Sequence, residues 1–241
     1  LESWLANTPI GFGGAVGTPA SMQLANGNVL VVWSGNGLNG MSYAVHDPLA
    51  VKLAEGTLNA SVGAPQFVYE LLPTADGGFD MLYRQDANQA SDLWLQHFDA
   101  TLQGGTPLLV AHDFATMTNL PAGAAALAGG AYAVAYTTKS DLPFDIGDIT
   151  LRIIAANGTV GPEIAVNTTT NGRQLDARVA TNGQNLFVSW WDEATQDVRG
   201  QILSLAGAKI GAEFLVPSTT VGDAGRPQIE ALPNGNYIVV W

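Results

Sequence analysis

Residues 26–33 read Asn26-Gly27-Asn28-Val29-Leu30-Val31-Val32-Trp33, a turn of Asn and Gly followed by an apolar run that closes on an aromatic side chain. Versions of this block return at residues 76–83, 129–136, 182–190 and 234–241. The closing aromatic residues are Trp33, Tyr83, Tyr136, Trp190 and Trp241, which gives intervals of 50, 53, 54 and 51 residues. A period of this length indicates a chain built from repeated supersecondary units.

Each period predicts about four short strands. The turn rich in Asn, Asp and Gly predicts a hairpin, because Gly and Asn accept the positive φ angles that tight hairpin turns require. The expected first strands are 19–24, 65–72, 176–180 and 227–232. The expected third strands are 93–98, 149–154 and 198–203, and the expected fourth strands are 163–166 and 213–216. No helical pattern competes with this interpretation.

The second strand of each period is apolar on both faces, as Leu30, Val31 and Val32 show. A strand of this kind is covered on both sides, as in stacked sheets. We therefore expect an all-β β-propeller of about five four-stranded repeats, the last incomplete, in one domain over residues 1–241. Residues 3–9 resemble a fourth strand, so strands from both ends would close the ring. The alternative is an open fragment of a larger propeller, whereas immunoglobulin-like sandwiches need about 100 residues per unit.

Composition excludes several classes of function. The chain carries 9 Lys and Arg against 21 Asp and Glu, a net charge of −12, so we expect no nucleic-acid partner. No apolar run approaches the ~18 residues of a membrane helix, so no membrane insertion is expected. Cysteine is absent, which excludes disulfides, zinc-thiolate sites and a cysteine nucleophile. Because the chain begins at Leu1 and ends at Trp241 inside an apolar run, we expect a piece of a longer polypeptide.

The block Asp76-Gly77-Gly78-Phe79 and the run 160–174, Val-Gly-Pro-Glu-Ile-Ala-Val-Asn-Thr-Thr-Thr-Asn-Gly-Arg-Gln, resemble a known repeat. They are similar to the repeats, about 50 residues long, of very large secreted, adhesin-like bacterial proteins, many of which carry calcium-binding RTX nonapeptides. The resemblance covers most of the chain and weakens between Ser34 and Ser61. It implies a secreted or cell-surface location and adhesion, and it offers no catalytic residues to carry over.

Loops between second and third strands are expected on one rim, and several carry Asp. The loop Phe144-Asp145-Ile146-Gly147-Asp148 could supply some of the six to eight oxygen ligands that calcium takes. We therefore predict Asp145 and Asp148 as metal ligands and calcium as the one possible cofactor. No segment matches an EF-hand loop or an RTX nonapeptide, so the alternative is a set of solvated acidic turns.

A sugar-binding lip is predicted on the same rim. Trp94 and Trp191 lie outside the closing-aromatic position, and exposed aromatic rings often stack on sugar faces. Trp191 is followed by Asp192 and Glu193, so these four residues are predicted to bind a ligand. The alternative is that both tryptophans pack between repeats.

Asp80 is the fifth predicted ligand-binding residue, because it stands where the other second strands carry Leu30, Ala133, Phe187 or Ile238. A buried carboxylate must be paired, protonated or placed at a cavity. Pairing with Arg84 is one alternative. A position near the ring axis is the other, and it would suit glycan hydrolysis, which needs two carboxylates.

From these residues we expect a non-enzymatic binding or scaffold module of a large secreted bacterial protein. It would bind a glycan or a surface protein through one rim, and no catalytic residue is assigned. The alternative is a carbohydrate-active propeller enzyme with Asp80 near the axis. A third possibility is that the repeats support a catalytic or adhesive segment elsewhere in the parent chain.

Overall fold

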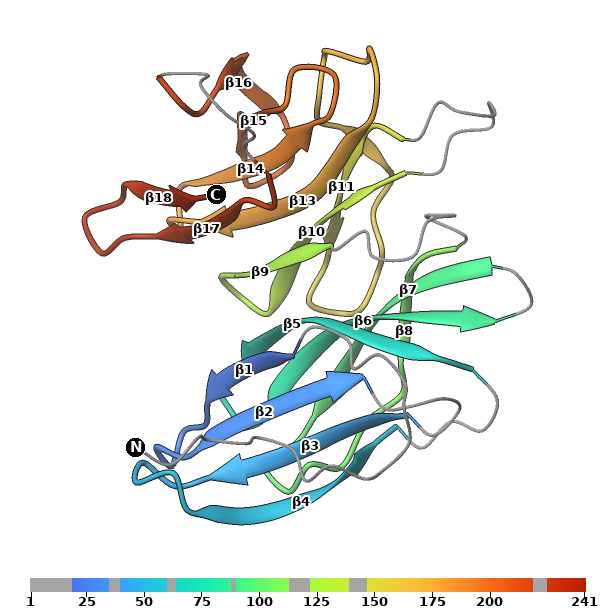
Figure 1. The fold of residues 1–241 in the computed structure, drawn as a ribbon, viewed down its shortest axis with the longest axis vertical. Coiled ribbons are helices and arrows are strands. Elements are labelled where there is room, and N and C mark those ends of the chain that lie inside the picture. Colours follow the sequence, from blue (N-terminus) through green and yellow to red (C-terminus); the bar gives the residue numbers. More distant parts are fainter. Residues whose placement is uncertain are drawn as a thin grey trace. The chain divides into compact units, whose positions relative to one another are not determined.

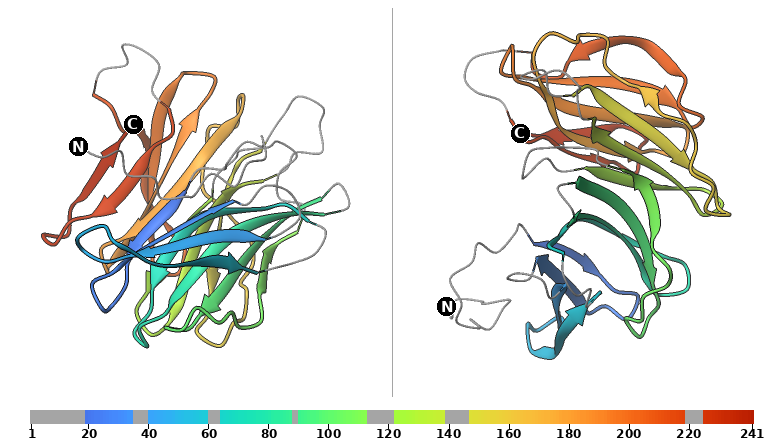
Figure 2. Two further views of the ribbon diagram at one scale, coloured as in Figure 1. Left: turned by 60° about the horizontal axis from the view of Figure 1, so that its bottom comes forward. Right: turned by 90° about the vertical axis from the view of Figure 1, so that its right-hand side faces the viewer.

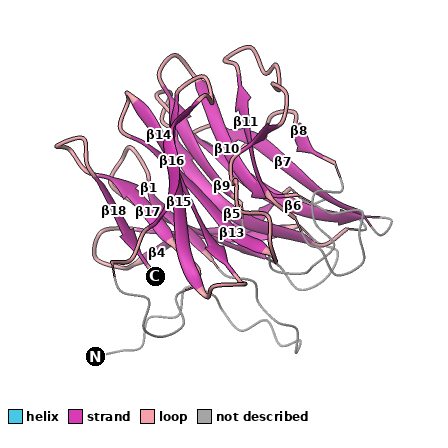
Figure 3. Ribbon diagram, turned by 90° about the horizontal axis from the view of Figure 1, so that it is seen from above, coloured by secondary structure: helices cyan, strands magenta, loops and turns pink. Residues whose placement is uncertain are grey.

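The computed structural model describes residues 19–34, 40–59, 64–87, 90–112, 122–138, 147–218 and 225–241. Within these ranges the chain forms strands and turns only, as Figure 3 shows. No helix in the described ranges has the length and apolarity to span a membrane. The chain divides into two compact units, Leu1–His112 and Asp113–Trp241. The expected single domain over 1–241 stays a prediction.

The first unit holds two four-stranded antiparallel sheets, each with its strands side by side in chain order (Figure 1). The first sheet consists of β1 (Ala20–Gln23), β2 (Val29–Ser34), β3 (Met41–His46) and β4 (Lys52–Leu58). The second consists of β5 (Gln66–Pro73), β6 (Phe79–Ala87), β7 (Ala90–Phe98) and β8 (Leu108–Ala111). The repeat thus persists in β3 and β4, which lie where its sequence pattern weakens.

The second unit holds two more four-stranded sheets and one two-stranded sheet. The four-stranded sheets are β9 (Gly123–Leu127), β10 (Ala131–Thr137), β11 (Ile149–Ile154), β12 (Ile164–Ala165), and β13 (Gln174–Thr181), β14 (Asn185–Asp192), β15 (Asp197–Ser204), β16 (Lys209–Leu215). The two-stranded sheet is β17 (Gln228–Ala231) with β18 (Tyr237–Val240). All-β architecture and antiparallel four-stranded sheets are confirmed, but a count of five is not. Residues 3–9 lie outside the described ranges, so closure through them stays a prediction.

The predicted hairpins form at the repeated turns, and each joins the first and second strands of a sheet. Gly27 at φ 85° and Gly183 at φ 83° supply the left-handed backbone that these turns require. The second strands β2, β6, β10 and β14 are buried on both faces over most of their length. In β18, Ile238 and Val240 are exposed, and no third strand lies beside it in the described residues.

The first strands of the second unit come together. β13 packs against both β9 and β17, and it also packs against the face of β10. Figure 2 shows the green-to-yellow β9–β12 sheet next to the orange β13–β16 sheet within this unit. The shared core is apolar, and the buried indole of Trp190 donates from Nε1 to Oε1 of Gln174 at 2.7 Å. This packing gives β13 neighbours on both sides and positions its side chains among three sheets.

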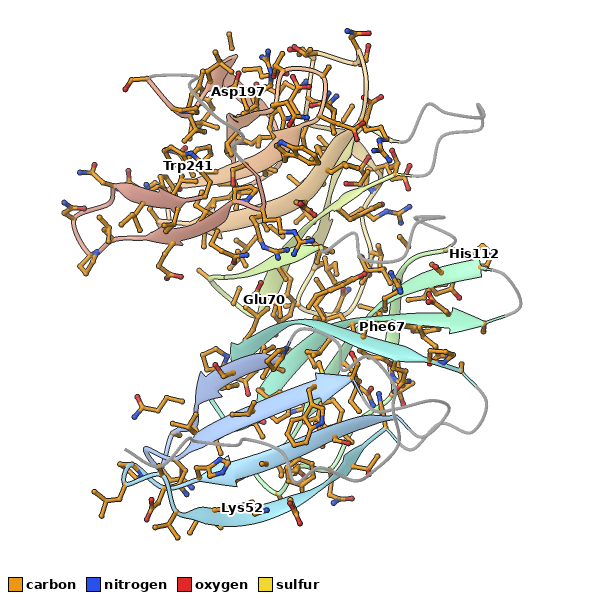
Figure 4. All side chains as sticks on the ribbon, viewed as in Figure 1. Lys52, Phe67, Glu70, His112, Asp197 and Trp241 are labelled. Atoms are coloured by element: carbon orange, nitrogen blue, oxygen red, sulfur yellow. The ribbon has the colours of Figure 1, made fainter. Side chains whose placement is uncertain are left out.

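Two first strands carry a β-bulge, an extra residue that shifts the register. In β5 the shift falls between Val68 and Glu70, and Figure 4 labels Glu70 on this strand. In β13 it falls between Leu175 and Arg178. Because a bulge bends the strand and re-aims a side chain, both positions break the regular alternation of faces.

Candidate functional site

Asp176 lies in the bulge of β13. Leu175 pairs with Trp191 and Arg178 pairs with Ser189, so two residues of β13 oppose the single residue Trp190. The backbone of Asp176 is left-handed, at φ 58°, and the residue is 8% exposed. Left-handed backbone at a non-glycine residue carries strain that concentrates at functional sites. The strand therefore holds a carboxyl group in a position that regular strand geometry would not give.

The surroundings of Asp176 favour a protonated carboxyl group. Burial raises its pKa, and the positive charges of Arg178 and Arg226 oppose that rise without cancelling it. No hydrogen bond to this carboxyl group joins it to any other described residue. Burial thus favours the neutral, proton-carrying form of this carboxyl group, which is the form in which a carboxyl group acts as a general acid.

Arg178 links the first strands of three sheets. Its Nη1 donates to the carbonyl oxygen of Ala122 at 3.0 Å, beside the start of β9. The Gln228 amide oxygen, oriented to satisfy its neighbours, accepts from Nε at 3.1 Å and from Nη2 at 3.2 Å. A Cβ at Gly123 would lie 2.9 Å from Cα of Arg178, so glycine permits the close approach of β9 to β13. Arg178 thus holds together the strands that surround Asp176.

Arg226 and Trp191 complete the cluster. Arg226 is exposed and has a left-handed backbone, at φ 53°. A Cβ at the preceding Gly225 would lie 3.9 Å from Nε1 of Trp191, so this segment runs along the edge of the half-buried indole. We call Asp176, Arg178, Trp191 and Arg226 the first-strand site. It combines a buried acid, an exposed guanidinium and an aromatic ring, which are groups that could bind and protonate a polar ligand.

Two carboxylates of the predicted sugar-binding lip are held in ion pairs. Asp192 is fully buried; its Oδ2 lies 2.6 Å from Nε of Arg199, and its Oδ1 accepts from the backbone N of Ala194 at 3.0 Å. Glu193 binds Arg173 through both carboxylate oxygens, and this hydrogen bonding lowers the pKa of Glu193. Of the predicted lip, the structure places Trp191 in the first-strand site and holds both carboxylates with arginines. Their role in ligand binding stays a prediction.

Trp94 and Asp80 lie in the first unit. Trp94, on β7 opposite Tyr83, packs partly against the core of that unit. Asp80 is buried on the second strand β6, and its Oδ1 lies 3.1 Å from Nδ1 of His97. The second ring nitrogen of His97, Nε2, lies 3.1 Å from Oδ2 of Asp76. Both residues belong to a sheet of the first unit, whereas the first-strand site is built from residues of the second.

The alternative pairing of Asp80 with Arg84 is not among the ion pairs of the described residues. Arg84 instead donates from Nη2 to Oδ2 of Asp86 at 3.0 Å. Its guanidinium lies 4.2 Å from the ring centroid of Phe67, which Figure 4 labels on β5. The directly opposite position to Asp80 on β7 is His97, so strand register decides the partner.

The predicted calcium ligands fall partly outside the described residues. Asp145 lies in the range 139–146, which is not described. Oδ1 of Asp148 accepts from Nδ2 of Asn167 at 2.7 Å. In the ranges that are described, no three His, Cys, Asp or Glu side chains gather as a metal site. Calcium therefore stays a prediction.

Asp176 was not among the residues singled out from the sequence, where it served only as the expected start of a strand at 176–180. The signal was present: Asp176 and Arg178 put two opposite charges into an otherwise apolar strand. The sequence pattern does not indicate the bulge that interrupts the regular alternation of faces at these two residues. A search for charges on first strands would have found the pair.

Several solved structures share the fold. The GH93 α-L-arabinofuranosidase of Fusarium graminearum with arabinobiose is 11% identical at a TM-score of 0.66, over 93% of this chain and 74% of that chain. The GH43 endo-arabinanase of Bacillus licheniformis is 13% identical at a TM-score of 0.52, over 92% of this chain and 91% of that chain. The exo-β-1,3-galactanase of Phanerochaete chrysosporium with β-1,3-galactotriose is 15% identical at a TM-score of 0.58, over 98% of this chain and 55% of that chain. No family model and no curated protein matches the chain.

The matched enzymes are β-propellers, and their likeness supports a β-propeller for this chain. The matches also correct the expected function. A non-enzymatic binding or scaffold module was expected, and that expectation is corrected, because the three matched folds named above belong to glycoside hydrolases. The resemblance to secreted RTX-associated repeats, the adhesive role and the extracellular location stay predictions.

Proposed function

We propose that the chain is a carbohydrate-active enzyme that hydrolyses glycosidic bonds, with Asp176 as its general acid. The observation that carries this proposal is the buried carboxyl group of Asp176, held in a left-handed bulge with a raised pKa. Its occurrence in a fold shared with glycoside hydrolases supports the reaction class. Arabinose- or galactose-containing glycans are the proposed substrates, and no finding supports a surface-protein partner.

The chemistry follows from the site. A protonated Asp176 would donate its proton to the leaving-group oxygen as the glycosidic bond breaks. The guanidinium of Arg226 would donate hydrogen bonds to sugar hydroxyl groups, and the Trp191 indole would contact a sugar face. Arg178 would act as a positioning residue, since it holds the strands on either side of Asp176.

Glycoside hydrolysis also needs a second carboxylate, as base or nucleophile. No carboxylate of the described residues is assigned to this role, since Glu230 on β17 follows Gln228 toward the turn at Leu232 and so lies away from Asp176.

The test compares leaving groups. Glycosides of arabinose and galactose are offered either as oligosaccharides or with a 2,4-dinitrophenolate leaving group, which departs without protonation. We expect Asp176→Asn to lower kcat/KM by about 10²–10⁴ on the oligosaccharides and far less on the activated glycosides. Glu163→Gln, whose carboxylate pairs with Arg152 away from the site, is the matched control.

Two results would contradict the proposal. The first is an Asp176→Asn variant that loses the same factor on both leaving groups, which would indicate a structural role. The second is a wild-type chain that turns over none of these glycosides, which would reject hydrolysis of this substrate class.

A further inference from the structure

A pocket of about 520 Å³ lies between two hairpin turns of the second unit. One turn joins β13 to β14, and the other joins β17 to β18. The lining residues are Thr181, Asn182, Gln184, Ala231, Leu232, Pro233, Asn234 and Gly235. We propose that this turn pocket is a second glycan-binding site, which takes neutral oligosaccharides and is separate from the first-strand site.

Hydrogen bonds between the two sheets hold the walls of the turn pocket. Nδ2 of Asn182 donates to the carbonyl oxygen of Gly235 at 2.8 Å. The backbone N of Asn182 donates to the Tyr237 hydroxyl at 3.2 Å, and that hydroxyl donates to the carbonyl oxygen of Asn185 at 2.8 Å. The pocket is therefore fixed before any ligand arrives, which lowers the ordering cost of binding.

The chemistry of the lining selects a neutral ligand. None of the lining residues is charged, although the chain carries a net charge of −12. Oδ1 of Asn234 accepts from the backbone N of Asn236, which leaves its Nδ2 as a donor. The exposed carboxamide of Gln184 makes no hydrogen bond to any other described residue. The carboxamides of Gln184 and Asn234 and the apolar sides of Leu232 and Pro233 match the mixed surface of an uncharged sugar.

The turn pocket and the acid of the first-strand site lie at opposite ends of β13. Asp176 is near the start of the strand and Thr181 is its last residue. Because the bulge takes up one residue, about four residues of extended strand separate the two, a span of about 13 Å. A disaccharide bound in the turn pocket would not reach Asp176, so binding there does not depend on the proposed hydrolysis.

Backbone amide NMR of the Asp176→Asn chain tests the proposal without turnover. Arabinobiose and β-1,3-galactotriose are titrated in, with a uronic-acid disaccharide as the charged comparison. We expect at least one neutral sugar to shift the amide signals of Asn182, Gln184 and Gly235 with saturation, and the uronic-acid sugar to leave them in place. The double variant Gln184→Ala/Asn234→Ala should weaken this binding at least about fivefold, the equivalent of about 1 kcal/mol.

The matched control is Asn28→Ala, which alters the corresponding turn between β1 and β2 and should leave the affinity unchanged. Thermal unfolding of each variant verifies that the fold is kept. The proposal is overturned if neither neutral sugar shifts the signals of the turn pocket, if only signals near Asp176 respond, or if the double variant binds as the parent does. Loss of turnover in Asp176→Asn has no bearing on these outcomes.

Discussion

The guanidinium of Arg178 donates a 3.0 Å hydrogen bond to the carbonyl oxygen of Ala122 and so crosses from one sheet to the next. Because the same side chain also meets the Gln228 amide, one residue connects the first strands of three sheets. The acid at Asp176 is two residues away on the same strand. The geometry of the first-strand site thus depends on an arginine that need not touch the ligand.

Replacing Arg178 with Met should lower the free energy of unfolding by about 1–3 kcal/mol, since the buried carbonyl of Ala122 loses its donor. Arg226→Met, at an exposed position, should change it by less than about 0.5 kcal/mol. Urea unfolding followed by tryptophan fluorescence measures both. Equal stability of the two variants would show that Arg178 does not connect the strands as described.

Trp191 and Trp94 form a second matched pair, because one belongs to the first-strand site and the other packs against the core of the first unit. Trp191→Leu should weaken the binding of arabinobiose or β-1,3-galactotriose to the Asp176→Asn chain about tenfold, as expected for a lost aromatic contact worth ~1.4 kcal/mol. Trp94→Leu should lower the melting temperature and leave affinity unchanged. Amide NMR of the residues beside Asp176 decides, because the same sugars are expected in the turn pocket, and unaltered binding at these signals in Trp191→Leu would remove this residue from the site.

Glu193 should matter to stability and not to ligand binding. Arg173 lowers its pKa in the folded state, so the pair contributes above the unfolded pKa, near 4.5, and the contribution is lost as pH falls through the lowered value. Because the pair lies near the surface, Glu193→Gln should cost less than about 1 kcal/mol at pH 7 and nothing at low pH. Unfolding at several pH values measures this. A drop in glycan affinity would instead restore Glu193 to a binding lip.

Asp80→Asn should leave turnover unchanged, because Asp80 lies on a second strand beside His97, outside the first-strand site. The variant keeps the size of the side chain and removes one charge next to the imidazole. Steady-state kinetics on the same glycosides measures the effect. A loss of turnover comparable to that of Asp176→Asn would place the reaction at Asp80.

The hairpins could be predicted from local sequence. Gly27 and Gly183 mark turns that form as predicted, and the expected strand 149–154 coincides with β11. The pattern failed where side chains are small, as in β9 (Gly123–Leu127), an alanine-rich strand with no apolar alternation. There, packing against β10 and β13 determines the strand, and that information is not local.

The site itself was harder to predict, because its members meet through register and packing. The bulge that presents Asp176 arises from one extra residue between two paired positions, and no spacing rule marks it. Asp80 was singled out as an exception among the second strands, yet its neighbour His97 follows only from the alignment of β6 with β7. The sequence identified unusual residues, whereas their contacts, which determine what they can do chemically, depend on strand register and packing.

Because its pKa is raised, Asp176 should affect the pH dependence of stability in the direction opposite to that of a carboxylate whose pKa is lowered. Burial raises this pKa in the folded chain above its ordinary value of 3.8, so the folded state binds the proton more tightly than the unfolded state does. The contribution of this group to stability is then greatest below pH 3.8 and declines as pH rises through the raised folded pKa. Each tenfold gain in the proton affinity of the folded state corresponds to about 1.4 kcal/mol.

Asp176→Asn removes this titration and should therefore stabilise the chain at pH 7, while its advantage should vanish below about pH 4. The Glu163→Gln control should behave in the opposite way, because Arg152 lowers the pKa of Glu163 and the pair supports the fold above that value. Urea unfolding at pH 3.5, 5 and 7 provides the comparison. A less stable Asp176→Asn chain at pH 7 would mean that the carboxylate is satisfied when ionised, and Asp176 could not then serve as a stored proton donor.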